Sequence, residues 1–258
     1  MDETKNTLAL ILSRQAYRED DSLVTIYSSA LGKLNLVARG TQKLQSKLAG
    51  HIEPLTLADI MIIRGKGYDY IGSAITRESY ISIRNDLNKL YYAGQALGLF
   101  GKFVKENQAD ERLFFLITNW LNVLNNFFST PISIDGEVSD LNKERGGLLF
   151  SFFALKFLSE LGYQPEMFQC LICGEKIKSG KNYFNLISGG IMCSSCFTKE
   201  SIKPDREGLK VLTISDNCVK IVRYIISNDL YSWEKLKVDK RLIKELSLLV
   251  DNFVKFCV

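Results

Sequence analysis

The chain has 258 residues, of which 46% are hydrophobic and 24% charged, and its 33 Lys and Arg against 29 Asp and Glu give a net charge of +4. These are the values of an ordinary globular protein of one or two domains, and they exclude a disordered or low-complexity chain. A charge this small confines any nucleic-acid surface to a local patch, and the one histidine, His51, excludes a multi-histidine metal site.

Residues 7–78 carry the patterns of five β-strands. Some of them alternate apolar and polar side chains, and others are rich in β-branched and aromatic residues. The expected strands are residues 8–13, 23–27, 33–39, 55–63 and 68–75. Five short strands with one long connection, residues 40–54, predict a small closed Greek-key barrel of the OB type, which leaves no exposed sheet edge.

From residue 86 the spacing of apolar residues becomes helical. The first long helix carries Gly94, Gly98 and Gly101 on one face. Because each glycine costs ~1 kcal/mol against alanine in a helix interior, this face predicts that something packs very close to it. Residues 145–161 are apolar nearly all round and predict the buried central helix of a bundle. Two amphipathic helices after residue 205 are expected to complete that bundle.

Two Cys-x-x-Cys pairs form the strongest local signal. Between Cys170 with Cys173 and Cys193 with Cys196 lie 19 residues, whose pattern predicts a short hairpin. Zinc prefers four thiolates in a tetrahedron, and a two-residue gap lets a tight turn aim both sulfurs at one ion. We therefore expect one structural Zn²⁺, since four thiolates leave no open coordination position. The alternatives are redox pairs, two disulfides or chance core thiols.

The two remaining cysteines and the histidine have structural interpretations. Cys218 and Cys257 lie on apolar helix stripes and are expected to be buried as small hydrophobic residues. His51 has no evident catalytic partner and is expected to be hydrogen-bonded within the fold. The residue inventory lacks a base–nucleophile pair, a phosphate loop or an open metal site, so we expect no enzymatic activity.

The stretch from Ser22 to Ile52 has no acidic side chain, although it contains four cations. Strand parity turns Lys33 and Arg39 to the same outer side of the barrel, and Lys43 and Lys47 follow on the long connection. Such a cationic face with aromatic platforms is how OB barrels bind single strands. We therefore predict DNA binding by Lys33, Arg39, Lys43 and Lys47. Tyr17, Tyr27, Tyr68 and Tyr70 are candidate stacking platforms, although a core or structural role is the commoner one for each tyrosine taken singly. A solvated barrel rim without a ligand is the alternative.

The predicted fold is α+β and multi-domain. It combines an N-terminal five-stranded OB barrel with a C-terminal helical bundle that contains an inserted four-cysteine zinc module. The expected domains are an OB-fold DNA-binding domain at residues 1–80, a helical domain at residues 81–165 and 206–258, and a zinc-ribbon-like insertion at residues 166–205. The polar, acidic N-terminus and the absence of a ~20-residue apolar stretch predict a cytoplasmic protein.

Several short motifs occur in a characteristic order. They are Tyr17-Arg18-Glu19 before a strand, Gly32-Lys33 opening the next, Val37-Ala38-Arg39-Gly40 leading into Ser46-Lys47-Leu48, then Pro54, and finally Cys170-Leu171-Ile172-Cys173-Gly174. In these motifs and in the order of its parts, the chain resembles the RecO family of bacterial recombination mediators over its full length. Some members of that family lack the cysteines.

The resemblance implies a function that periodicity does not give. RecO proteins bind single- and double-stranded DNA, anneal complementary strands and, with RecR, help RecA replace single-stranded-DNA-binding protein. They are not enzymes, and the resemblance implies a nucleoid-associated location in the cytoplasm. It also implies that the helical body binds the acidic C-terminal tail of the single-stranded-DNA-binding protein. Candidate cations for that contact are Lys235, Lys237, Lys240, Arg241 and Lys244.

Two other classes of function stay open. One is a zinc-ribbon and OB protein of transcription or translation, which would bind RNA or a polymerase. The other is a metal-supported nuclease or transferase, which the residue inventory disfavours.

Overall fold

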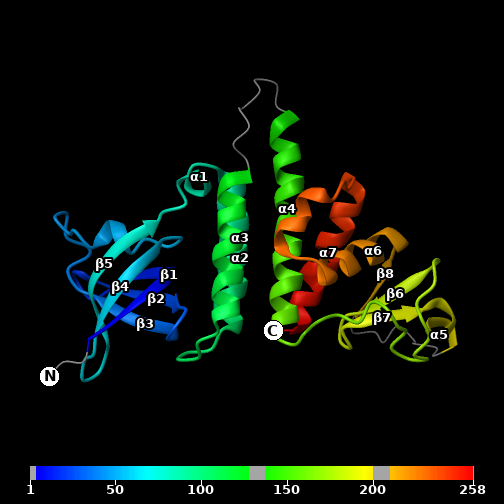
Figure 1. The fold of residues 1–258 in the computed structure, drawn as a ribbon, viewed down its shortest axis with the longest axis horizontal. Coiled ribbons are helices and arrows are strands. Elements are labelled where there is room, and N and C mark those ends of the chain that lie inside the picture. The colour runs from blue at the N-terminus through cyan, green and yellow to red at the C-terminus, as the bar shows by residue number, and fades with distance from the viewer. Residues whose placement is uncertain (1–3, 128–136, 200–209, 258) are drawn as a thin grey trace. The chain divides into compact units, whose positions relative to one another are not determined.

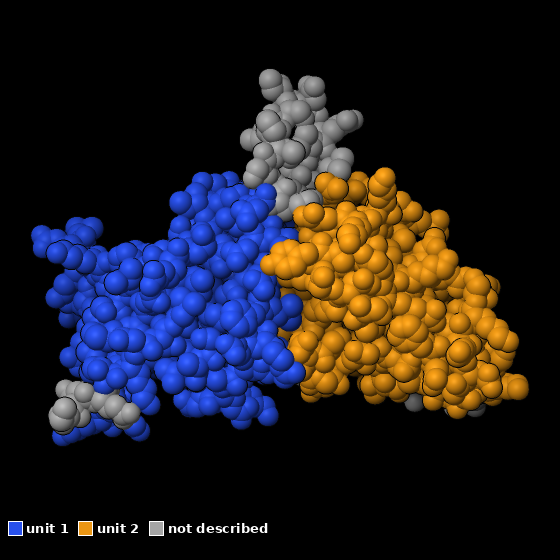
Figure 2. Space-filling view, viewed as in Figure 1, with its two compact units in different colours: residues 1–129 blue, residues 130–258 orange. Residues whose placement is uncertain are grey.

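A computed structural model describes residues 4–127, 137–199 and 210–257 of the chain (Figure 1). The chain divides into two compact units, residues 1–129 and 130–258, which Figure 2 colours separately. The first unit holds the strands of a barrel and three helices. The second holds the remaining helices and a small sheet.

Five strands close the predicted barrel in the order β1-β2-β3-β5-β4. Their bounds are β1 Thr4–Tyr17, β2 Asp21–Ser28, β3 Gly32–Ala38, β4 Leu57–Ile63 and β5 Tyr70–Glu78. The long β1 closes the barrel because its first half pairs with β4 and its second half with β2, with a register shift between Ile11 and Ser13. Alternate side chains such as Val24, Ile26 and Leu36 fill the interior.

Arg14 holds the long β3–β4 connection against the barrel. Its guanidinium donates to the carbonyl oxygens of Thr41 at 2.9 Å and Ala49 at 3.2 Å, and it pairs with the carboxylate of Glu53. The connection includes a short 3-10 helix, η1 (Ala49–His51). A single arginine therefore ties both ends of this connection to β1.

Three helices pack beside the barrel in the first unit: α1 (Ile81–Arg84), α2 (Leu87–Phe103) and α3 (Glu111–Phe127). Asp86 caps α2 by accepting from two backbone N–H groups of its first turn. Tyr27, on the outer side of β2, lies with its ring centroid 4.8 Å from that of Phe100 in α2 and 6.5 Å from that of Phe114 in α3. This aromatic cluster covers part of the outer face of the barrel.

The glycines of α2 are not closely packed. A Cβ atom added at Gly94, Gly98 or Gly101 would meet no other described atom within 4 Å. The close packing predicted for this face is therefore wrong for the part of the chain that the structure describes.

The second unit is built around α4 (Glu137–Glu160), whose residues 148–155 are all buried, as predicted for a central helix. Helices α6 (Asp216–Ser227) and α7 (Lys240–Cys257), with the 3-10 helix η2 (Leu230–Lys235), pack against it. A three-stranded sheet in the order β7-β6-β8 and the short α5 complete the unit. Their bounds are β6 Asn182–Asn185, β7 Gly190–Cys193, α5 Ser194–Lys199 and β8 Val211–Ile214.

The two compact units divide the chain differently from the three predicted domains. They group α2 and α3 with the barrel, whereas the prediction groups residues 81–165 with residues 206–258. The predicted boundary at 205 and 206 lies outside the described residues, and the three-domain division stays a prediction. Within the described ranges, no helix is both long and apolar enough to cross a bilayer.

Candidate metal centre and nucleic-acid interface

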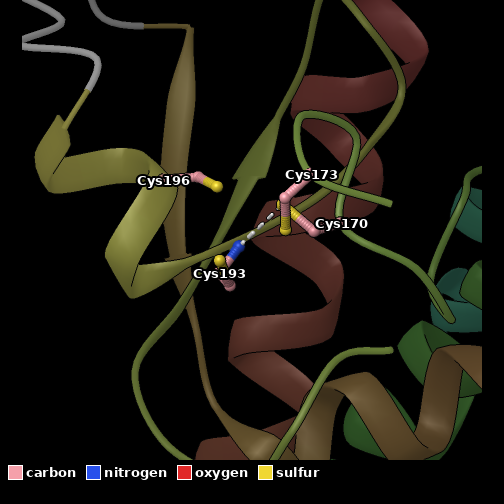
Figure 3. Close-up of side chains that lie close together, drawn as sticks. All are labelled: Cys170, Cys173, Cys193 and Cys196. Carbon is pink, nitrogen blue, oxygen red and sulfur yellow. Dashed lines mark hydrogen bonds between the residues drawn. The ribbon is translucent and has the colours of Figure 1, made fainter. Parts of the chain in front are cut away.

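The first cysteine pair lies on a tight turn between α4 and β6. The backbone N–H of Gly174 donates to the carbonyl oxygen of Cys170 at 2.9 Å, and that of Cys170 donates to the carbonyl oxygen of Glu175 at 2.8 Å. Gly174 has a φ of +71°, a conformation that glycine adopts without strain. The turn places the sulfur atoms of Cys170 and Cys173 close to each other (Figure 3).

The second pair comes from the end of β7 and the start of α5. The β6–β7 hairpin pairs Asn182 with Cys193, and one turn of α5 adds Cys196. The Cys193 backbone N–H donates to the Cys170 sulfur at 3.4 Å, the dashed line in Figure 3. The four Sγ atoms all lie within 4.8 Å of one another. A tetrahedron of zinc–sulfur bonds near 2.3 Å places its sulfurs ~3.8 Å apart, so this cluster fits a metal ion.

Backbone dipoles favour negative charge within the cluster. Burial opposes ionisation of Cys170, but N–H groups of Cys173, Cys193 and Ile172 face its sulfur, and the pKa of this thiol is lowered to about 6. The hydrogen bond to the Cys193 thiol, with burial, raises the pKa of Cys196 to about 12. All six cysteines of the chain are free thiols in the structure. The arrangement is thus a cluster that stabilises a thiolate and could hold a cation.

Of the two other cysteines, Cys218 is fully buried, as predicted. Cys257 is only partly buried, so the prediction holds less well there. The imidazole Nδ1 of His51 accepts from the backbone N–H of Thr76 at 3.3 Å and lies 2.8 Å from the hydroxyl oxygen of that residue. These contacts join η1 to β5 and agree with the structural role predicted for this histidine.

The structure does not gather the four cations predicted to bind DNA into one group. Lys33 and Arg39 lie at opposite ends of β3, six residues and therefore ~20 Å apart. The ammonium of Lys33 donates to the carbonyl oxygen of Gly101 in α2 at 2.7 Å. Lys43 forms an exposed ion pair with Asp20 at 3.0 Å, and Lys47 is exposed on the long connection.

Two aromatic contacts, each with an arginine, lie at one end of the barrel and include three of the four tyrosines. The guanidinium of Arg39 lies 4.0 Å from the ring centroid of Tyr70. The rings of Tyr17 and Tyr68 meet edge to face at 6.0 Å, and the guanidinium of Arg18 lies 5.0 Å from the Tyr17 ring. We call Tyr17, Arg18, Arg39, Tyr68 and Tyr70 the aromatic rim.

The aromatic rim is assembled by barrel closure. Tyr17 pairs with Asp21 across the β1–β2 turn, and Val37, near the end of β3, pairs with Tyr70 at the start of β5. The rim thus includes the β1–β2 and β4–β5 loops, the two loops with which OB folds bind oligonucleotides. Cations and ring faces together are the components of a single-strand site.

One of the four candidate tyrosines has the structural role that was its alternative, and one arginine of the rim was not among the predicted DNA contacts. Tyr27, a candidate stacking platform, is 1% exposed and packs between the barrel and the helices, so it is not available to a base. Arg18 was not singled out, although its position beside Tyr17 in a turn was a usable signal. No pattern along the chain indicates that Tyr17 and Tyr68 meet, because only the closed barrel joins their strands.

A second candidate surface lies in the C-terminal unit. A pocket of about 560 Å³ opens between α4, η2 and the start of α7. Leu148, Trp233, Leu236 and Ile243 supply apolar walls. The charged residues of the lining are two cations and two carboxylates: Arg145, Lys237, Glu234 and Asp239. Of the five cations considered for partner binding, Lys240 forms an ion pair with Glu144 at 2.6 Å. The pocket therefore combines an apolar interior with a charged border.

Comparison with known proteins identifies relatives of both units. The family model "Recombination protein O N terminal" matches residues 1–80, and "Recombination protein O C terminal" matches residues 139–258. The chain is 29% identical over 250 residues to the DNA repair protein RecO of Dehalococcoides mccartyi, covering 97% of this chain and 89% of the relative. It is 29% identical over 248 residues to the RecO of Desulforamulus reducens, covering 96% and 87%. With the RecO of Roseiflexus sp. it shares 28% identity over 254 residues, covering 98% and 81%.

Proposed function

The chain belongs to the RecO family of DNA repair proteins, and on that premise we propose that it binds single- and double-stranded DNA and anneals complementary strands. With RecR, it helps load RecA onto DNA coated by single-stranded-DNA-binding protein. The protein acts in the cytoplasm at the nucleoid, and it works by binding and bringing strands together without catalysing bond chemistry.

The aromatic rim is the observation that carries this proposal. Two groups, Arg18 with Tyr17 and Tyr68 and Arg39 with Tyr70, lie at the end of the barrel where OB folds bind oligonucleotides. A base stacked on such a ring is worth about 1–3 kcal/mol, whatever its identity. A strand held by phosphate contacts and ring faces keeps its base edges available for pairing, which is what annealing needs.

The four predicted cations contribute unequally in this proposal. Arg39 lies in the rim, and Lys43 and Lys47 lie on the exposed connection that follows it. Lys43 must exchange Asp20 for a phosphate, an inexpensive exchange because both partners are exposed. Lys33 must give up the carbonyl of Gly101, so we expect its contribution to DNA binding to be the smallest.

The four-cysteine cluster holds one structural zinc ion in this proposal. The donor set supports it, because four thiolates match the preference of Zn²⁺ and leave no ligand position for a substrate. Cys170, Cys173, Cys193 and Cys196 would bind the ion as thiolates. The ion would join the turn before β6 to the β7–α5 junction, since each supplies two of the ligands.

The pocket beside η2 is the site we propose for the acidic C-terminal tail of the single-stranded-DNA-binding protein. Its apolar walls would contact the hydrophobic side chains of such a tail, and Lys237 would pair with its carboxylates. Lys235, Lys240, Arg241 and Lys244 lie nearby in the chain and would add to the electrostatic attraction.

Strand annealing by rim variants tests the central proposal. We expect Tyr68→Ala to slow annealing of complementary oligonucleotides and to weaken single-strand binding in fluorescence anisotropy. Tyr91→Ala is the matched control, because Tyr91 is an exposed tyrosine of the same unit, on α2, 60% exposed against 49% for Tyr68. Equal loss in both variants, or annealing unchanged by Tyr68→Ala, would contradict the proposed site. A wild-type preference for RNA over DNA would instead favour a protein of transcription or translation.

A further inference from the structure

Helix α2 exposes an apolar face that no other described residue of the first unit covers. Leu87, Leu90 and Tyr91 are 85%, 38% and 60% exposed, and Gly94 and Gly98 continue the same face one and two turns further on. From residue 87 to residue 101 the helix has one charged residue, Lys89, and its side chain is buried. A helix without a polar side is normally covered all round. The exposed side of α2 therefore has the character of an interface.

A groove of about 630 Å³ runs beside this face, between α2 and the outer side of the barrel. Thr25, Lys33 and Asn35 line it from β2 and β3. The wall formed by α2 consists of Leu90, Gly94, Leu97, Gly98, Gly101 and Lys102. The lining residues other than Lys33, Asn35, Lys102 and Glu106 are small or apolar.

Three glycines at this wall weaken the helix, by ~1 kcal/mol each against alanine. None of them adopts a left-handed backbone, and a Cβ added at any of them would meet nothing within 4 Å in the described structure. Neither helix geometry nor internal packing therefore requires glycine at positions 94, 98 and 101. Because glycine has no side chain, another chain in the groove could approach the backbone of α2 closely at these positions.

We propose that this groove is a docking site for an amphipathic α-helix of a partner protein. A bare helix wall lets a second helix approach closely, and Leu87 and Tyr91 extend the contact beyond the groove. Helix α2 has 17 residues and a length of ~26 Å, enough for about five turns of a partner. The site is distinct from the aromatic rim and does not depend on DNA binding.

The charges at the groove set the direction and the chemistry of the partner helix. Lys102 and Lys105 are exposed at the C-terminal end of α2, whereas Glu106 already accepts from the Asn35 amide at 2.6 Å. At the other end, the carboxylate of Asp86 already caps the first turn of α2. A partner helix running antiparallel to α2 would place its first turn at the two lysines. Acidic residues there are favoured by those lysines and by the dipole of the partner helix itself.

A nucleic-acid strand fits this groove less well. The described lining contains no aromatic ring on which a base could stack. Of its two lysines, Lys33 is bonded to the Gly101 carbonyl, and Glu106 would repel a phosphate. The apolar wall is thus better matched to side chains than to a sugar-phosphate backbone.

The test fills the groove without harming the fold. Gly98→Leu places a side chain in open space and improves helix propensity, so the full-length variant should be at least as thermally stable as the wild type. Gly98→Ala is the conservative variant. Gly50→Leu is the matched control, because Gly50 also has nothing within 4 Å of an added Cβ and lies in η1.

The probe is a labelled 18-residue helical peptide with alanine and leucine on one face and three acidic residues in its first turn. We expect wild-type protein, Gly98→Ala and Gly50→Leu to bind it in fluorescence anisotropy, and Gly98→Leu to lose about tenfold or more in affinity. Reversing the first-turn charges to lysine should weaken binding to the wild type.

Three outcomes would overturn the proposal. One is no peptide binding by the wild type, or equal binding by the wild type and Gly98→Leu. Another is loss of oligonucleotide binding in Gly98→Leu with peptide binding kept, which would make the groove part of the DNA path. The third is concentration-dependent self-association of the wild type that Gly98→Leu abolishes, which would identify the occupant as a second copy of the chain.

Discussion

The guanidinium of Arg39 lies 4.0 Å from the centre of the Tyr70 ring, although 31 positions separate the two residues in the sequence. Arg39 follows the end of β3, and Tyr70 begins β5 after the turn from β4. This contact places a fixed positive charge on an aromatic face at the end of the barrel. In the proposed function, these two groups would offer a phosphate and a base positions that are set before binding.

The salt dependence of DNA binding should separate the cations. Each phosphate contact to a single strand adds about 0.7 to the slope of log affinity against log salt, through release of counterions. We expect Arg39→Ala, Lys43→Ala and Lys47→Ala each to reduce the slope by about that amount, and Lys33→Ala to reduce it least. Arg77→Ala is a control, because Arg77 lies at the far end of β5 from the rim, paired with Asp59. An unchanged slope in the triple Arg39, Lys43 and Lys47 variant would place the DNA site elsewhere.

Loss of a cysteine ligand should affect the second unit alone. We expect Cys173→Ser to release the metal and to expose the β6–β7 hairpin to proteolysis, because the link from the turn before β6 to the β7–α5 junction would be lost and the four-residue β8 would be the strand that still pairs with the hairpin. The first unit has its own buried core and should keep its stability. Elemental analysis of the wild type should give one zinc per chain. A content well below one, with four freely titratable thiols, would exclude the proposed ion.

The proposed tail pocket should respond to the charge at its border. We expect Lys237→Glu to weaken binding of an acidic tail peptide, and added salt to weaken binding to the wild type. Trp233 lines the pocket, so its fluorescence should report the peptide directly. Lys220→Glu changes the same charge on the exposed side of α6 and is the control. Equal effects of the two variants would indicate general attraction without a defined pocket.

The stability of the second unit should fall in alkaline solution. Burial, with the nearby charge of Glu245, raises the pKa of the Cys218 thiol to about 12, above the ordinary value of 9.0. A group with a raised folded pKa stabilises the fold fully below its unfolded pKa, and this contribution is lost as pH rises toward the folded pKa. The free energy of unfolding should therefore fall by up to about 1.4 kcal/mol per pH unit above pH 9 because of this thiol.

Denaturant unfolding of metal-loaded protein between pH 8 and pH 11 measures this effect. Cys218→Ala should be less stable than the wild type at neutral pH, since it leaves a small cavity. Its stability should decline less steeply above pH 9. Parallel declines in the two proteins would show that another group controls the alkaline limit, and Cys257, whose pKa burial also raises, is the next to test.

Much of this protein could be predicted from local sequence patterns. Alternation and β-branched content predicted the five strands, because side chains of a strand point alternately to its two faces. The spacing of Cys170 with Cys173 and of Cys193 with Cys196 predicted the metal cluster, because a two-residue gap fixes the geometry of each pair locally. Both predictions rested on patterns within short segments of the chain, and for the cysteines the hairpin between the two pairs brings them together.

Only the tertiary structure decided which distant residues meet. Barrel closure brings Tyr17 to Tyr68 and Arg39 to Tyr70, and it sends Tyr27 beneath the helices, although the residues themselves have similar local patterns. Strand parity correctly turned Lys33 outward, but parity could not foresee that α2 would place the carbonyl of Gly101 there. The physical reason is that periodicity gives the face on which a side chain lies, whereas strand order and helix packing determine what that face contacts.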